Sequence, residues 1–147
     1  MGDFELSSSS DGGLAEFAEK LRRLSTNAAS NQINQAAADA VKERVELEFE
    51  RAEDPYGNKW KDTVRGNHPL TGETRDLRTS VKVEITGKGF VILVTDWKAI
   101  FHQGGTRRGI PARPMLPVGG KLPDTWSYAM DLAVRGAIAD ILDVSAG

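Results

Sequence analysis

The sequence predicts an α+β domain in which a small, mainly antiparallel sheet packs against a long helix and a C-terminal helix. Apolar residues recur every three or four positions over residues 32–52 and again over 124–142, the spacing of amphipathic helices. Between these segments, residues 81–86 alternate apolar and polar side chains and residues 90–95 are almost continuously apolar, as in strands. At 147 residues, with 39% hydrophobic and 27% charged residues, the chain is most simply one domain with its own core.

The N-terminal part predicts an arm followed by a helix. Residues 1–12 are mostly polar and are expected to be a flexible arm, so that residues 13–147 make up the single domain. An amphipathic helix is expected over residues 13–25, where the apolar positions have helical spacing. These positions are Leu14, Phe17, Leu21 and Leu24.

A polar stretch over residues 25–31 predicts a break before the long helix, which is expected from Gln32 to Ala52. Its apolar stripe consists of Ile33, Ala37, Val41, Val45 and Phe49, widened by Ala36 and Ala40. Asp54-Pro55 is expected to end this helix, because a proline ring disfavours helical geometry at the residue before it.

Glycines and prolines over residues 55–76 predict a long loop, with Trp60 as its anchor because burial of an indole is worth a few kcal/mol. The two strands are expected to be joined as a hairpin by Gly87-Lys88-Gly89. Because residues 90–95 are almost continuously apolar, this strand is expected to be covered on both faces. Residues 96–101 predict one helical turn. Trp126 is expected to be buried and to seat the C-terminal helix.

The composition excludes several classes of site. The chain contains no cysteine and two histidines, and it shows no metal-ligand spacing and no nucleophile motif, so no metal and no cofactor is expected. A net charge of −2, from 19 basic and 21 acidic residues, gives no general attraction for nucleic acid. No apolar stretch approaches the roughly 20 residues that cross a bilayer, so no membrane association is expected.

His102 is the candidate for acid–base chemistry, with Asp96 as the residue that could orient its ring. No motif places a nucleophile or a second titratable partner beside it. We therefore expect no enzyme activity and expect His102 to pin the following loop through a hydrogen bond. A small hydrolase centred on His102 remains an alternative.

The segment from residue 101 to residue 116 predicts a semi-rigid arm that carries arginines. Gly104, Gly105 and Gly109 permit unusual backbone angles, whereas the prolines restrict φ. Guanidinium groups on a stiffened arm lose little entropy on pairing, so this arm suits a subunit interface. The predicted interface residues are Arg107, Arg108, Ile110, Pro111, Arg113 and Pro114.

Two other interpretations of the arginines stay open. Arg113 could close the arm onto its own domain by pairing with a nearby carboxylate. Alternatively, the protein is a nucleic-acid-binding module whose basic side chains contact phosphates. That module would use Arg75, Arg78, Arg107, Arg108 and Arg113.

Taken in order along residues 14–142, four blocks resemble the tailed-phage virion morphogenesis (tail completion) family. They are the Asp54-to-Trp60 turn, Leu77-to-Val81 at the opening of a strand, His102-Gln103-Gly104, and the block from Ile110 to Leu116. The last block, Ile-Pro-Ala-Arg-Pro-Met-Leu, is the most specific together with the preceding His-Gln-Gly. The motif residues assigned a structural role are Asp54, Pro55, Gly57, Trp60, His102, Gln103 and Gly104.

This resemblance implies a structural virion protein of the head–tail neck, without known catalysis, that acts in tail completion or head–tail joining. It would be made in the host cytoplasm and form a homo-oligomeric ring around the DNA channel, next to a portal-side connector or the tail tube. A ring needs a heterologous interface, in which one patch meets a different patch on the next subunit. We expect the arginine arm to be one patch and the acidic helix segment from Glu43 to Glu53 to be the other.

Overall fold

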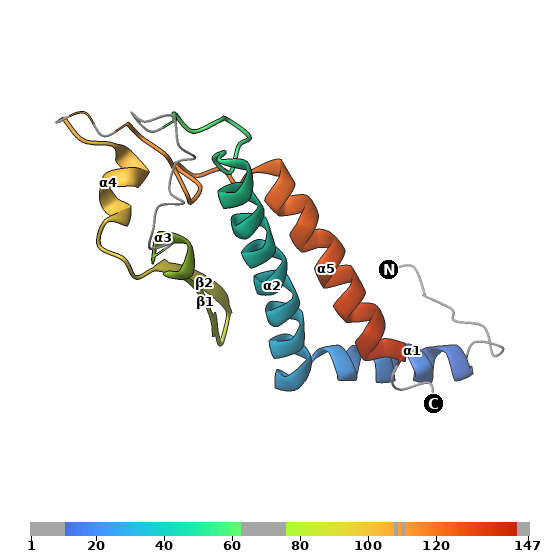
Figure 1. The fold of residues 1–147 in the computed structure, drawn as a ribbon. Helices are drawn as coiled ribbons and strands as arrows, with labels where there is room; N and C mark the ends of the chain where they lie inside the picture. The colour runs from blue at the N-terminus through green and yellow to red at the C-terminus, as the bar shows by residue number, and fades with distance from the viewer. Residues whose placement is uncertain (1–10, 63–75, 108, 110, 144–147) are drawn as a thin grey trace.

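The computed structural model describes residues 11–62, 76–107, 109 and 111–143. The helices and strands in chain order are α1 (Asp11–Leu24), α2 (Asn27–Arg51), α3 (Asp76–Thr79), β1 (Val81–Thr86), β2 (Gly89–Val94), α4 (Ala99–Gly104) and α5 (Asp124–Asp143). Figure 1 shows α2 and α5 side by side in opposite directions, with the β1–β2 hairpin on the other side of α2 and α1 at its base. The predicted α+β class, a small antiparallel sheet packed against a long and a C-terminal helix, is confirmed.

The N-terminal boundaries differ from the prediction in detail. The predicted arm lies almost wholly outside the described residues, and α1 already begins at Asp11. The predicted break shrinks to Ser25 and Thr26, because the Thr26 hydroxyl accepts a hydrogen bond from the Ala29 N–H at 3.0 Å and caps α2 there. Residues 27–31, predicted to be a break, are therefore helical.

The C-terminal end of α2 is set by a backbone cap and not by Asp54-Pro55. Ala52 has left-handed backbone angles (φ 53°, ψ 48°), and the Glu53 N–H donates to the Glu48 carbonyl at 3.1 Å. This is the bonding pattern that closes helices before a proline is reached. The predicted end at Ala52 agrees with the observed end at Arg51 within one residue, but the predicted cause, the proline ring, was wrong.

The core lies along the stripe of α2 that the sequence predicts. Val41, Val45 and Phe49 are buried there, and Phe49 meets the Trp60 ring edge-on, with ring centroids 5.4 Å apart. Trp60 and Trp126 are 5% and 2% exposed, so both indoles are buried as predicted. The C-terminal helix also begins at the predicted residue, Asp124.

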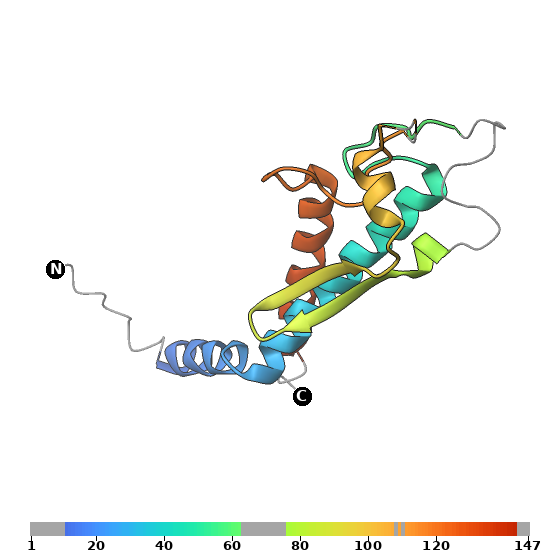
Figure 2. The same cartoon turned by 90° about the vertical axis from the view of Figure 1, so that its left-hand side faces the viewer.

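The hairpin lies across α2, as Figure 2 shows, and a two-residue turn at Gly87-Lys88 joins its strands. Its register runs from the pair Val81 and Val94 to the pair Thr86 and Gly89. Phe90, Ile92 and Val94 pack against the core, whereas Val91 and Leu93 are exposed. Cover on both faces was therefore a wrong expectation, because α2 packs on one face and no described element covers the other.

Two further segments differ from the prediction. Leu77 to Thr79, predicted to open a strand, form the short helix α3, and the strand begins at Val81. The helical turn predicted over residues 96–101 lies three residues later, as α4 from Ala99 to Gly104, so the motif residues His102 and Gln103 lie on α4 rather than in a loop. None of the helices described is long and apolar enough to span a membrane.

Candidate functional site

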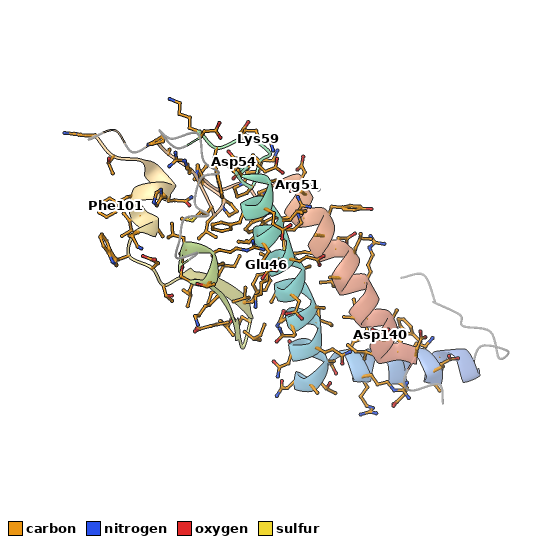
Figure 3. All side chains as sticks on the ribbon, viewed as in Figure 1. Glu46, Arg51, Asp54, Lys59, Phe101 and Asp140 are labelled. Carbon is orange, nitrogen blue, oxygen red and sulfur yellow. The ribbon has the colours of Figure 1, made fainter. Side chains whose placement is uncertain are left out.

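The Asp54 turn follows the cap of α2, and Figure 3 places Asp54 and Lys59 at that end of the helix, near Arg51. Asp54 Oδ1 accepts hydrogen bonds from the N–H groups of Tyr56 and Asn58, both at 2.9 Å. Two motif residues fix the rest of the turn. These are Pro55, which is buried, and Gly57, whose φ of +88° disfavours any side chain.

Trp60 connects this turn to the arm that follows α4. Its N–H donates to the Ala52 carbonyl at 2.7 Å, which ties the chain back to the end of α2. Its indole Nε1 donates to the carbonyl of Pro114 at 2.9 Å. Trp60 thus anchors its loop, as predicted, and also holds a segment more than fifty residues further along the chain.

Gln103 holds the arm from the other side. Its side-chain oxygen accepts from the N–H groups of Met115 and Leu116 at 2.8 and 3.1 Å, and its Nε2 donates to the Leu116 carbonyl at 2.8 Å. One amide thereby satisfies three backbone groups of an extended segment that has no strand partner. Met115, which is 1% exposed, is consequently pinned in the core.

Arg113 faces its own domain. It is 6% exposed, and its guanidinium donates to the carbonyls of Lys61 and Asp62 at 2.8 and 3.1 Å. The backbone N–H of Arg113 donates to the His102 carbonyl at 2.6 Å. The expectation that this side chain reaches outward is therefore corrected. The alternative that Arg113 closes the arm onto its own domain is confirmed, but with two backbone carbonyls as partners in place of a carboxylate.

Trp60, Gln103 and Arg113, with the backbone groups they bind, form what we call the motif clamp. It joins residues 60–62, the last turn of α4 and residues 113–116 into one hydrogen-bonded unit. The Tyr56 hydroxyl extends it, since its one proton can be donated to the carbonyl of either Val118 or Lys121, which lie 2.9 and 2.8 Å away. Gly104, the last residue of α4, precedes the exposed part of the arm.

Residues 105–107, 109, 111 and 112 are the described part of the arm between α4 and the motif clamp. Gly105 and Gly109 have φ values of +72° and +103°, so both use the conformational freedom of glycine. Arg107 is exposed, whereas Pro111 and Pro114 are half-buried. Arg108 and Ile110, predicted to belong to the interface, lie outside the described residues.

The predicted basic cluster is not brought together as a single surface among the described residues. Arg113 is buried, and Arg78 pairs with Glu50 at 3.0 Å. Arg107 is the exposed member, and Arg75 lies outside the described residues together with Arg108. The described part of the cluster therefore supports a contact at Arg107 more than a continuous groove for a phosphate backbone.

His102 is half-buried on α4. Burial lowers its pKa, and the charges of Arg113 and Lys98 lower it further, against a smaller effect of Asp96. The net effect favours the neutral form of the imidazole. No hydrogen bond of its ring to Asp96 is found in the described part of the chain, so the orienting pair considered from the sequence does not form there.

No cluster of potential metal ligands is found in the described part of the chain. No three His, Asp or Glu side chains gather there as metal ligands would. A cavity of about 390 Å³ lies between the Asp54 turn and the start of α5. It is lined by charges of both signs, the cations Arg44, Arg51 and Lys121 and the carboxylates Glu53, Asp54 and Asp124.

No family model, no curated protein and no solved structure matches this chain.

The exposed face of α2 carries an acidic stripe, directly opposite its buried face. Asp39, Glu43, Glu46 and Glu50 recur along it at steps of three and four residues, and all four are exposed. Figure 3 shows Glu46 at the middle of the helix. Two residues of the predicted acidic patch do not belong to this stripe. Glu48 lies on the opposite, buried face, and Glu53 pairs with Lys59 at 3.6 Å.

Glu48 is the feature that sequence reasoning missed. It is 2% exposed, and its Oε1 accepts a hydrogen bond from the Trp126 indole at 2.5 Å, which links α2 to α5. Burial raises the pKa of Glu48 to about 7, although the Trp126 hydrogen bond and the charge of Arg44 oppose the rise. The available signal was its position, since Glu48 shares the apolar face of Val41 and Val45.

The raised pKa of Glu48 predicts a pH dependence of stability. An ordinary glutamate titrates near 4.5 in the unfolded chain, so the folded protein binds more protons than the unfolded one between about pH 4.5 and pH 7. The contribution of Glu48 to the free energy of unfolding is therefore complete below pH 4.5 and is lost as the pH rises to about 7. Urea unfolding measured over this range tests the prediction.

The control for this prediction is Glu48→Gln, which keeps the acceptor for Trp126 but cannot titrate. The difference in stability between this variant and the wild type should change across the same pH range and stay constant above pH 8. A difference independent of pH throughout would contradict the raised pKa.

Proposed function

We propose that the protein is a structural subunit of a tailed-phage virion. In this proposal it forms a homo-oligomeric ring around the DNA channel at the head–tail neck, acts in tail completion or head–tail joining, and carries out no catalysis. Its partners are copies of itself and adjacent neck or tail proteins.

The observation that carries this proposal is the motif clamp. Three of the four sequence blocks that resemble the virion morphogenesis family meet there, although Trp60 and Arg113 are 53 positions apart in the sequence. Their polar groups are used to bind backbone atoms within the domain, and not to present a reactive group. Such an arrangement supports a rigid mount for the projecting arm, because a preorganised arm loses less entropy when it forms an interface.

The charges of the arm and of α2 support a heterologous contact. Arg107 projects from the arm, and the acidic stripe of α2 offers carboxylates on a different face of the same chain. Opposite charges on two distinct patches fix the register of neighbouring subunits and favour a head-to-tail arrangement, which closes into a ring when the rotation permits. We propose that Arg107 of one subunit contacts Glu43 or Glu46 of the next.

Arg107→Glu should leave the free energy of unfolding within about 0.5 kcal/mol of wild type, because the side chain is exposed. It should lower ring formation and the titre of complemented phage by about tenfold or more, because like charges then face each other. Adding Glu43→Arg to Arg107→Glu should restore part of the ring formation and part of the titre. The measurements are analytical ultracentrifugation of purified protein and plaque counts.

Lys82→Glu is the matched control, since Lys82 is an exposed cation on the hairpin, away from the arm. It should change neither ring formation nor titre. Electron microscopy of virions with this chain located in the density tests the neck position itself. A chain found outside the neck, or absent from virions, would overturn the proposal.

A further inference from the structure

The cavity between the Asp54 turn and the start of α5 is lined by a cation that has no counter-ion among the described residues. Arg44 of α2 is half-buried and lines this cavity of about 390 Å³. Its Nε is enclosed by protein atoms without an acceptor, and no hydrogen bond or ion pair of its guanidinium is found in the described part of the chain. Such an enclosed donor costs free energy unless a bound ion or water satisfies the group.

Glu48, one helical turn after Arg44, neutralises that charge only in part. The Oε1 of Glu48 accepts the hydrogen bond of the Trp126 indole, and its Oε2 is enclosed without a donor. Burial also raises the pKa of Glu48 to about 7, so the carboxyl carries only part of its charge at neutral pH. Part of the charge of Arg44 is therefore left uncompensated within the fold.

Two of the three carboxylates that line the cavity are already engaged. Asp54 accepts three hydrogen bonds inside its own turn, from two backbone N–H groups at 2.9 Å and one side-chain amide at 3.0 Å. Glu53 lies between Arg51, at 3.8 Å, and Lys59, at 3.6 Å. Neither carboxylate is therefore left over to pair with Arg44.

The other charges of the lining lie at the start of α5. Asp124 is the first residue of this helix, where the N-terminal N–H groups favour a negative charge. Lys121 is exposed on the segment before it, and its backbone carbonyl lies 2.8 Å from the Tyr56 hydroxyl, which holds this segment against the Asp54 turn. Arg44 and Lys121 are thus two cations that face one cavity against the single remaining carboxylate.

The rest of the lining includes apolar side chains. Pro55 and Pro123 are buried there, and Leu122 is 50% exposed. The volume of the cavity falls in the range of sites that hold small organic molecules, and it exceeds what a bare phosphate or acetate ion fills. The lining therefore suits an anionic group that is attached to an organic body.

We propose that this cavity binds a small organic molecule through a carboxylate or phosphate group held by Arg44 and Lys121. A guanidinium donates two parallel hydrogen bonds to either oxyanion, and an ammonium adds a compact positive charge. The prolines and Leu122 contact the organic part of the ligand. This inference goes beyond the proposed function and does not rest on it, because the site lies within one chain.

Nuclear magnetic resonance of the arginine Nε–H groups tests the site in the purified wild-type protein. The probes are phenyl phosphate and phenylacetate, added at constant ionic strength. At least one of them should shift the Arg44 signal to saturation with a Kd of about 1 mM or tighter. The signal of Arg135, an exposed arginine paired with Asp131 on α5, should not move. Inorganic phosphate and acetate should bind about tenfold more weakly, because they lack the part that contacts the apolar lining.

Variants of the two cations identify the residues that hold the oxyanion. Arg44→Gln and Lys121→Gln should each weaken binding by about tenfold, because each removes one charged donor. Thermal unfolding checks the fold of both, and Lys121 is exposed, so its replacement leaves the core intact. Lys88→Gln is the matched control, since it removes an exposed cation at the turn of the hairpin, and it should bind the probes as the wild type does.

Three results would overturn the inference. A shift that does not saturate, or that is as large at Arg135 as at Arg44, would show only a general attraction between anions and cations. Equal affinity for phenyl phosphate and inorganic phosphate would exclude an organic ligand. Unchanged affinity in both Arg44→Gln and Lys121→Gln would place the bound anion elsewhere.

Asp124→Asn distinguishes a ligand site from an ion pair internal to the protein. Removal of this carboxylate should strengthen binding of the probes by about threefold, because a like charge is lost from the lining, and should leave the Arg44 signal of the unliganded protein in place. If that signal moves without ligand and the affinity does not rise, Asp124 is the counter-ion of Arg44 and the inference is wrong. All these measurements use the isolated protein, so their outcome is independent of whether the chain is found at the neck.

Discussion

Replacing Trp126 by alanine is expected to lower the free energy of unfolding by about 3 to 5 kcal/mol. The indole is 2% exposed and packs into the core between α2 and α5, so its removal leaves a cavity that the surrounding helices fill only in part. It also leaves the buried Glu48 carboxyl without the donor it has at 2.5 Å. Urea unfolding followed by circular dichroism measures the loss.

The chain supplies a matched control in Trp97, which is 70% exposed and contacts Phe101 edge-on. Trp97→Ala should cost less than about 1 kcal/mol. Trp126→Phe separates the two contributions, because it retains most of the ring but cannot donate to Glu48. If Trp126→Ala lowered the free energy of unfolding by less than about 1 kcal/mol, the Trp126 indole would not be what holds α5 in place.

Arg113→Met is expected to destabilise the fold by about 2 to 3 kcal/mol, because methionine keeps much of the length of the side chain but cannot donate hydrogen bonds. The carbonyls of Lys61 and Asp62 would lose their donors, and the motif clamp would lose its link between the Trp60 segment and the arm. Urea unfolding at pH 7 measures this loss. A larger loss should accompany Arg113→Glu, which removes the same donors and also adds an unpaired buried charge.

Arg107→Met is the matched control, since it removes an arginine from the exposed part of the same arm. It should leave the free energy of unfolding unchanged within about 0.5 kcal/mol. If the Arg113→Met protein is stable but fails to assemble, Arg113 acts in the subunit interface, as its place in the sequence predicts.

The sequence predicted where the main elements lie, because their apolar patterns are local. The stripe of α2 from Ala37 to Phe49 and the alternation over Val81 to Ile85 depend on residues a few positions apart. The ends of elements were less predictable. Thr26 sets the start of α2 through one hydrogen bond to Ala29, and Ala52 sets its end through left-handed backbone angles. Such single contacts outweigh the average helix propensities of the residues around them.

The candidate site was predictable in its residues and much less so in its geometry. Gln103, Trp60 and Arg113 were all singled out along the chain, but Arg113 was assigned to an outward-facing arm. Its partners are backbone carbonyls 51 and 52 positions away, and a carbonyl has no sequence signature. Glu48 shows the same limit, since a carboxylate among other carboxylates gives no sign of burial unless the face of its helix is known.

By itself, the sequence determined the class of the fold, the position of α2 and α5, the hairpin and the burial of both Trp60 and Trp126, because local periodicity and the hydrophobic effect suffice for these. The tertiary structure decided which side chains face which neighbours. It turned Arg113 inward, buried Glu48 against Trp126, and left the apolar side chains Leu14, Phe17 and Leu21 of α1 exposed. The physical reason is that such pairings depend on how segments far apart in the chain pack together. A short stretch of sequence does not show which distant segment will lie against it.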